Sequence, residues 1–232
     1  ADQLFLAAKA YLDPAAPAAA HDLDPGMEAP RELFLGLPCK GVAPVLTLQL
    51  RRRQHGRHTL LRLPHRKRPP QDLLGEKLLV ALPLIDELCQ KALIERHTVL
   101  HVLPGAALAG TICHHPLRGQ GYDFDVPLLA ADFVEADQGT GLVHIAPGHG
   151  ADDWELGMAN GIEVPQTVGE DGSFYPHVPL FAGKRVLRPD GKKGDADPAV
   201  IAALKEAGAL LAQGRLTHSY PHSWRSKAPL IF

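Results

Sequence analysis

A run near the middle of the chain, GTGLVHIAPGHGADD at 139–153, constrains the local fold more than any other stretch. Its order is a turn, a short apolar strand, a glycine-rich bend and an acidic helix start. Pro147 ends the strand because proline removes a ladder donor. The glycines after it allow positive φ and the close approach of a ligand or of another backbone. This order predicts that His144, on the strand, and Asp153, in the first helical turn, converge on one small ligand.

Each of these two residues also has a purely structural interpretation. An acid in a first helical turn commonly stabilises the helix terminus, and a histidine on a strand is usually packed or on the surface. The helix predicted at 151–158 ends at Asn160-Gly161, a common stop signal. The functional interpretation therefore depends on the whole run rather than on either residue alone.

The run resembles the signature of the editing domain of isoleucyl-tRNA synthetases, Gly-Thr-Gly-x-Val-His-x-Ala-Pro-Gly-His-Gly-x-x-Asp, and matches it at every fixed position. The related valyl and leucyl enzymes keep the Gly-Thr-Gly but differ after it. Two further stretches, GYDFDVPL at 121–128 and HSYPHSWR at 218–225, are similar to family segments that precede the signature and that return to the synthetic core. The resemblance covers roughly residues 76–232 and implies a mixed α/β, β-rich, barrel-like editing domain.

The resemblance implies hydrolysis of the ester that joins a misattached valine to the 3′ end of tRNA(Ile). Synthesis alone misincorporates valine because one methylene is worth only about 1–3 kcal/mol, and isoleucyl enzymes are themselves the reference case for this limit. Asp153 would hold the α-ammonium group, His144 would contact the terminal ribose hydroxyls, and an ordered water would attack the carbonyl. The further substrate-binding residues that the resemblance implies are Thr140, Gly141, Pro147, Gly148, His149 and Gly150.

Several absences predict a fragment of a larger cytoplasmic enzyme. The chain starts at Ala1 without a methionine and stops within the apolar run PLIF at 229–232. Neither the His-Ile-Gly-His nor the Lys-Met-Ser-Lys-Ser signature of class I synthetic sites occurs, so we expect no cofactor here and ATP and Mg only in the synthetic core. No signal peptide or membrane-spanning run is present. The expected partners are the acceptor end of tRNA(Ile) and the remainder of the synthetase chain, with no membrane.

Metal and thiol chemistry are not expected. The cysteines Cys39, Cys89 and Cys113 are widely spaced and odd in number, which favours reduced thiols over disulfides or a zinc site. The histidines in and near the signature have no third ligand clustered with them at the sequence spacing of a zinc site. These histidines are His114, His115, His144 and His149.

Local patterns predict the elements and four segments. Helices are expected at 2–12, at about 84–94 and from an N-cap at Asp197 to a stop at Gly208. Strands are expected at 98–102, 111–113, 210–213 and 216–220. The resulting division is an N-terminal helix and linker at 1–30, an atypical basic segment at 31–75, the editing domain at 76–217 and a return segment at 218–232.

The basic segment has three interpretations. Eight of the 24 Lys and Arg residues lie at 51–70, and no Asp or Glu occurs from 33 to 71. A contact with tRNA phosphates would use this charge. A solvated, poorly ordered loop would explain the prolines and the weak periodicity. A slip of the translation frame upstream of about Gln71 would also produce an arginine-rich, acid-free stretch, and the coding DNA would test it.

The family carries a threonine-rich motif, Trp-Thr-Thr-Thr-Pro-Trp-Thr, in the region of the basic segment. It forms the wall of the pocket opposite the signature, and this chain lacks it. We therefore expect a recognisable site with weakened or no activity. The alternative function is a non-catalytic tRNA-binding or structural fragment of the synthetase.

Overall fold

The computed structural model describes most of the chain after residue 76 and four strands before it. The described residues are 2–12, 32–38, 47–51, 57–62, 77–134, 140–217 and 222–230. For the strands before residue 77 and for 214–217, only the backbone is considered. In this part of the chain, no helix is both long and apolar enough to cross a bilayer.

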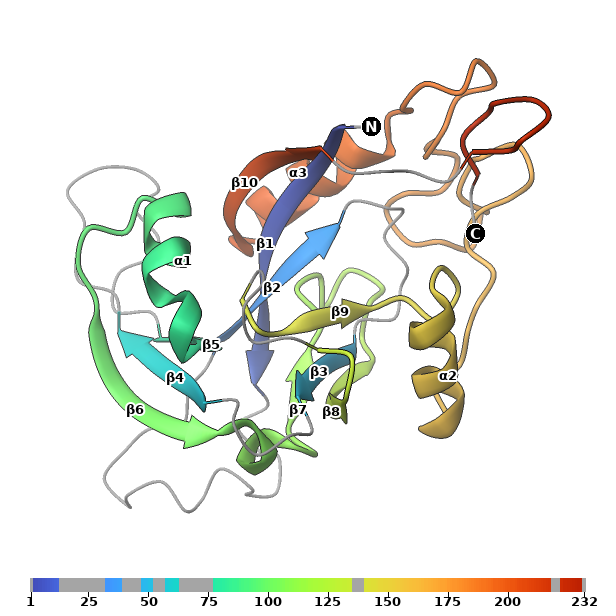
Figure 1. Cartoon of the computed structure of the whole chain (residues 1–232). Helices are drawn as coiled ribbons and strands as arrows, with labels where there is room; N and C mark the ends of the chain where they lie inside the picture. The colour runs from blue at the N-terminus through green and yellow to red at the C-terminus, as the bar shows by residue number, and fades with distance from the viewer. Residues whose placement is uncertain are drawn as a thin grey trace.

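Ten strands and a few short helices make up the described fold (Figure 1). The strands are β1 Asp2–Leu12, β2 Glu32–Pro38, β3 Thr47–Arg51, β4 Arg57–Arg62, β5 Lys77–Ala81, β6 Thr98–Pro104, β7 Ile112–His114, β8 Asp125–Ala131, β9 Val143–Ile145 and β10 Leu210–Thr217. The helices are α1 Ile85–Lys91, α2 Ala151–Ala159 and α3 Ala196–Glu206, with 3-10 turns η1 Leu82–Leu84 and η2 Gly105–Leu108. The β-rich, mixed α/β prediction is confirmed.

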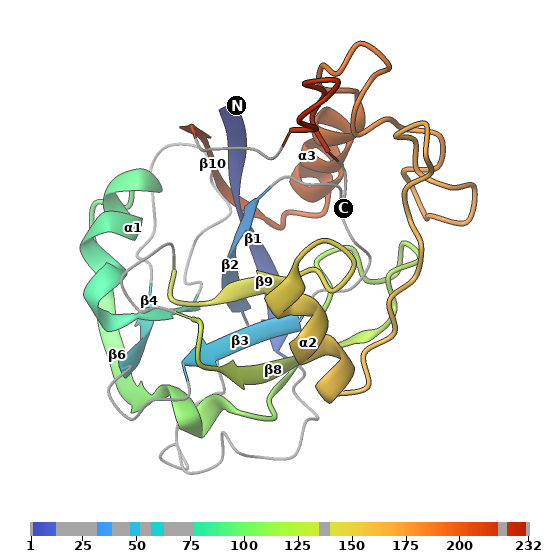
Figure 2. The ribbon, with the colours of Figure 1, turned by 45° about the vertical axis from the view of Figure 1, so that its right-hand side comes forward.

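Six of the strands follow one another around a barrel-like arrangement. The pairings run from β1 to β7, β8, β3, β9 and β2, and β2 pairs with β1 again. Figure 2 shows β2, β9, β3 and β8 side by side, with α2 at the end of β9. Two of these strand pairings are short. β2 and β9 share the single residue pair Gly36↔Val143, and β1 and β7 share two residue pairs. The barrel is therefore not closed by continuous hydrogen bonding between the described strands.

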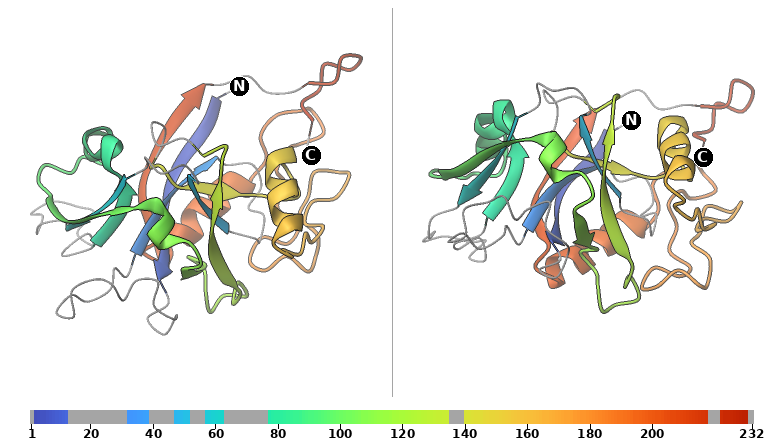
Figure 3. Two further views of the ribbon diagram at one scale, coloured as in Figure 1. Left: turned by 60° about the horizontal axis from the view of Figure 1, so that its bottom comes forward. Right: turned by 90° about the horizontal axis from the view of Figure 1, so that it is seen from below.

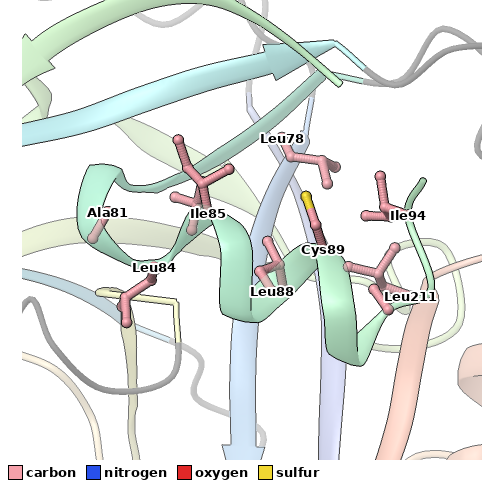
Figure 4. Packing of buried hydrophobic residues seen from close by; sticks show 10 residues of the cluster. Leu78, Ala81, Leu84, Ile85, Leu88, Cys89, Ile94 and Leu211 are labelled. Atoms are coloured by element: carbon pink, nitrogen blue, oxygen red, sulfur yellow. The ribbon is translucent and has the colours of Figure 1, made fainter. Parts of the chain in front are cut away.

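Strand β5 connects two apolar cores because successive side chains of a strand point to opposite faces. Leu78 and Val80 pack in one core with α1 and with Leu211 of β10, as Figure 4 shows for part of this cluster. Leu79 points the other way, into a core inside the barrel. The other buried members of this barrel core are Leu108, Cys113, Val126, Leu128 and Leu142.

Helix α1 is held by its buried face, and we expect Leu88→Ala to lower the free energy of unfolding by about 2–5 kcal/mol. Leu88 is 4% exposed in the α1 core, whereas Leu93, just after the helix, is 72% exposed. Leu93→Ala is the matched control and should change stability by less than about 0.5 kcal/mol. Urea denaturation of both variants measures the difference, and equal effects would contradict the packing.

A third core lies under α3. It joins the loop at 117–122, the irregular stretch at 174–181 and the inward face of α3, with Tyr122 and Phe181 as its largest fully buried side chains. Figure 3 shows α3 beside β1 and β10, and α2 on another side of the molecule. The predicted N-cap of this helix, Asp197, is wrong by two residues. The helix is preceded by Asp195, whose carboxylate instead accepts the backbone N–H of Arg185 at 2.8 Å.

The helix predicted at 2–12 is wrong, because these residues form the long strand β1. β1 pairs with β10 along one edge and with β2 along the other. Pairing on both edges satisfies the backbone of β1 and overrides the helical preference of its alanines. The two strands predicted at 210–213 and 216–220 are in fact one strand, β10, as far as Thr217.

The basic segment at 31–75 contributes β2, β3 and β4, each paired with neighbours in the sheet. Ladder pairing gives these strands partners that the local sequence does not indicate. The poorly ordered loop stays a prediction for the segment. Several predictions lie outside the described residues: the linker at 13–30, the arginines at 52, 53, 66 and 68, Cys39, and the start of the return segment at 218–221. The frame slip stays a prediction.

Candidate functional site

The predicted order of strand, bend and helix start is confirmed. β9 pairs antiparallel with β3, and His144 lies opposite Leu48. The bend after β9 is tightened by His149, whose backbone N–H donates to the Ala146 carbonyl at 2.8 Å. Gly150 then takes an extended conformation, and α2 begins at Ala151.

Neither glycine of the bend has a positive φ, and only Gly150 is needed for space. Gly150 has a φ of −145°, and Gly148 is also outside the left-handed region. A Cβ on Gly150 would lie 3.0 Å from Oδ2 of Asp153, and one on Gly148 would lie 3.4 Å from Val164 Cγ1. The bend therefore lets the Asp153 carboxylate fold back against the main chain.

Asp153 occupies the third position of α2 and ties the helix to the end of β9. Its Oδ2 accepts the backbone N–H of Ala146 at 3.0 Å. Burial raises the pKa of this half-buried carboxyl above 3.8, and repulsion from Asp152 adds to the rise, while the Ala146 hydrogen bond and His149 oppose it. The ionised form is therefore costly in the empty site, and a cationic ligand beside the carboxylate would offset that cost.

Thr140 and Gly141 belong to the scaffold behind the strand. The Thr140 hydroxyl donates to the Leu142 carbonyl at 3.1 Å, and the backbone carbonyl of Thr140 accepts the Ala81 N–H at 2.8 Å. Gly141 has a φ of +74°, and a Cβ there would lie 2.3 Å from Cβ of Ala81. The left-handed glycine that this site requires is thus Gly141. Direct contact of these residues with substrate stays a prediction.

A second histidine, His115, lies within electrostatic range of His144 and was not identified as a site residue from the sequence. It directly follows β7 and is 1% exposed. Its Nδ1 accepts the Leu117 backbone N–H at 3.0 Å, and its ring stacks on Tyr122 with 4.7 Å between centroids. The available signal was its position two residues after Cys113, which places both side chains on the same face of the β7 segment.

Burial, and to a smaller extent His144, lower the pKa of His115 from 6.5 to about 3. His115 is thus uncharged in the native protein throughout the physiological range. The contribution of His144 places the two rings within electrostatic range of each other.

This shift predicts a pH-dependent stability. Between pH 6.5 and 3 the unfolded state takes up a proton on His115 that the native state does not, so native stability falls as the pH falls through this window. From pH 6.5 to 5 the loss should be roughly 2 kcal/mol at most. Urea denaturation at pH 7 and pH 5 checks it, because His115→Gln cannot titrate and should show a smaller difference between the two pH values. An identical difference in the two proteins would contradict the assignment.

A groove of about 1200 Å³ opens beside the bend and α2. Pro147, Gly148 and His149 line it, together with Trp154, which is 49% exposed. Arg185 and Tyr175 also line it. His144 and Asp153 are not among the residues that line this groove. Their convergence on one ligand stays a prediction.

Comparisons with known proteins identify the family of the chain. Isoleucine–tRNA ligases of Gluconobacter oxydans and Bradyrhizobium diazoefficiens are 49% and 48% identical over 169 residues, and that of Caulobacter vibrioides is 47% identical over 165 residues. Each match covers 68% of this chain but 17% of the relative, so the chain spans a small part of the length of these relatives. No protein-family profile matches the chain.

Solved structures show the same fold. The GlLeuRS-CP1 crystal structure superposes with a TM-score of 0.53 at 10% identity, covering 94% of this chain and all of that one. The editing domain of the Plasmodium falciparum cytosolic leucyl-tRNA synthetase gives a TM-score of 0.53 at 9% identity over 93% of this chain. These identities are too low to carry more than the fold.

Proposed function

Since this chain is homologous to a part of the isoleucine–tRNA ligases and has the fold of a class I synthetase editing domain, we propose that it hydrolyses the ester of valine misattached to tRNA(Ile). The observation that carries the proposal is the half-buried carboxylate of Asp153, held by the Ala146 N–H at the start of α2. An aminoacyl ester presents one fixed cation, its α-ammonium group. A partly desolvated carboxylate is suited to bind that cation.

In the proposed reaction, Asp153 anchors the ammonium group and His144 contacts the terminal ribose. The oxygen of a water molecule attacks the ester carbonyl carbon, the bond from that carbon to the ribose oxygen breaks, and the ribose oxygen takes up a proton. The products are free valine and uncharged tRNA. The protein supplies orientation rather than a nucleophile, because an ester is already activated and a positioned water then suffices.

The groove beside Pro147 to His149 is the proposed approach for the acceptor end of the tRNA. Its volume of about 1200 Å³ exceeds the usual range of small-molecule pockets. Trp154 offers an exposed ring on which a base can stack, and Arg185 brings a positive charge, although Asp171 lies 3.2 Å from it. The remainder of the synthetase chain is the proposed partner that delivers the tRNA, in the cytoplasm.

We expect the discrimination against isoleucine to be weak. The strand beside His144 is β3, with the sequence TLQLR, which holds a single threonine. A pocket wall without the threonine-rich motif lacks the contacts that limit the size of the bound side chain. The ammonium anchor is independent of this wall.

The test is release of amino acid from tRNA(Ile) charged with labelled valine or isoleucine. Loss of valine above the rate of spontaneous deacylation, together with slower loss of isoleucine, supports editing. Binding of both charged tRNAs without release contradicts it and favours the alternative, a non-catalytic tRNA-binding fragment. The salt dependence of binding reports the phosphate contacts, including any made by the basic segment.

A further inference from the structure

His115 and His144 lie on opposite walls of the barrel. In the ring of pairings, β7 and β9 are separated by β8 and β3 on one side and by β1 and β2 on the other. The two strands run in the same direction, because β7 is antiparallel to β8, β8 is parallel to β3, and β3 is antiparallel to β9.

Each histidine lies on the interior face of its strand segment, and both lie toward the same end of the barrel. Cys113 and Leu142 belong to the barrel core, and His115 and His144 follow them by two residues. Alternation along an extended chain places residues two apart on the same face. The electrostatic effect of His144 on His115 agrees with this placement.

The hydrogen-bonding state of His115 follows from its contacts. Because Nδ1 accepts the Leu117 N–H, the single proton of the neutral ring is on Nε2. This Nε2–H is a buried donor that has no hydrogen-bond acceptor among the described residues. Leaving a buried donor unsatisfied costs about 1–3 kcal/mol, and such groups in native proteins usually have a function.

Packing alone does not require this donor. His115 stacks on Tyr122 and lies 5.3 Å from Phe124 between ring centroids. A phenylalanine at this position would fill the same stack but would leave the Leu117 N–H without its acceptor. Neither the stack nor the Nδ1 acceptor uses the Nε2–H, so this donor is the part of the ring that packing does not explain.

We propose that His115 is a positioning residue of the active site, whose Nε2–H donates through one bridging water to the imidazole of His144 and fixes a single tautomer of that ring. The inference rests on the proposed function, in which His144 contacts the terminal ribose. The nitrogen of His144 that receives the bridge is unprotonated, and the other nitrogen carries the proton toward the substrate. His115 stays neutral in this arrangement, so the donor side of the bridge buries no charge.

The test is the tautomer of His144 in the whole chain, read from the nitrogen shifts of the labelled imidazoles by NMR and assigned with His144→Asn. His115→Asn keeps an acceptor for the Leu117 N–H but has no donor at the Nε2 position. His115→Gln places an amide N–H near that position. We expect one tautomer in the wild type and in His115→Gln, and a mixture in His115→Asn.

Two further variants separate positioning from packing. His115→Phe keeps the ring stack and removes the donor, so it should also give a mixture of His144 tautomers. It replaces His115→Asn in the experiment if His115→Asn does not fold. Tyr122→Phe changes the same stack and removes the hydrogen bond to the Pro179 carbonyl, 2.9 Å long, and should leave His144 unchanged. A wild-type tautomer in either donor-free variant, or an equal change in Tyr122→Phe, overturns the proposal.

The activity measurement distinguishes this proposal from the proposed function. If the wild type releases valine, the donor-free variants should lower kcat by roughly 10- to 100-fold with an unchanged KM, the range known for groups that orient histidine metal ligands. His115→Gln should recover most of the rate. If the wild type releases no valine, the proposed function fails, while the NMR comparison still decides whether His115 fixes the tautomer of His144.

Discussion

Replacing Asp153 by Asn should lower kcat/KM for release of valine from tRNA(Ile) by about 10- to 150-fold, the equivalent of a lost charge-assisted contact of about 1.5–3 kcal/mol. The amide oxygen of Asn can still accept the Ala146 N–H, which in the wild type is 3.0 Å from Oδ2. The scaffold is therefore kept and only the negative charge is removed. Rates of release from charged tRNA, measured under single-turnover conditions, give the comparison.

The same substitution should not destabilise the protein. Because the pKa of Asp153 is raised in the native state, the native protein binds this proton more tightly than the unfolded chain does. Ionisation therefore costs native stability at neutral pH, and the cost disappears as the pH falls below the unfolded value of 3.8. Asp153→Asn should thus be at least as stable as the wild type at pH 7, with a smaller advantage at acidic pH.

Two matched variants make the result interpretable. Asp152→Asn removes the exposed neighbouring acid, which makes no hydrogen bond to the bend, and should leave the rate nearly unchanged. Asp153→Ala removes the acceptor of the Ala146 N–H as well and should lower the free energy of unfolding by about 1–3 kcal/mol. Equal rates for Asp153→Asn and Asp152→Asn would exclude Asp153 as the ammonium anchor.

The second large effect concerns the turn before the site. Gly141→Ala should lower the free energy of unfolding by about 2–5 kcal/mol, since it combines a left-handed backbone with overpacking. The φ of Gly141 is +74°, and the new Cβ would lie 2.3 Å from Cβ and 3.3 Å from Cα of Ala81 in β5. The Ala81 backbone is held there by its hydrogen bond to the Thr140 carbonyl, so it cannot move away without losing that bond.

Gly161→Ala is the control for the backbone part of this effect. Gly161 follows α2 with a φ of +66°, and a Cβ there would meet nothing within 4 Å. It should cost about 1 kcal/mol, the usual penalty for a side chain in this conformation. Urea denaturation of both variants gives the difference. A cost for Gly141→Ala no larger than that for Gly161→Ala would show that the contact with Ala81 is not tight.

Local signals explain which elements were predictable. α2 was placed correctly because Pro147, the glycines of the bend and Gly161 mark its two ends within a few residues. α1 was predicted from apolar residues at helical spacing, and Ile85 and Leu88 do form its buried face. The predicted end near residue 94 is too late, because the helix ends at Lys91 and Leu93 is exposed. β1 was misjudged because alanines favour a helix locally, whereas β10 and β2, its partners, lie far away or beyond a linker in the sequence.

The candidate site divides in the same way. Local sequence was sufficient to place the bend, the helix start and Asp153 in the first turn, because proline, glycine and acidic residues act on their own neighbours in the chain. Only the packing of distant strands shows that His115 lies within electrostatic range of His144 and that Gly141, not Gly148 or Gly150, has a positive φ. The alternation of side chains along a strand specifies which residues share one face of that strand. Which residues of another strand lie opposite that face across a barrel depends on strand order and register.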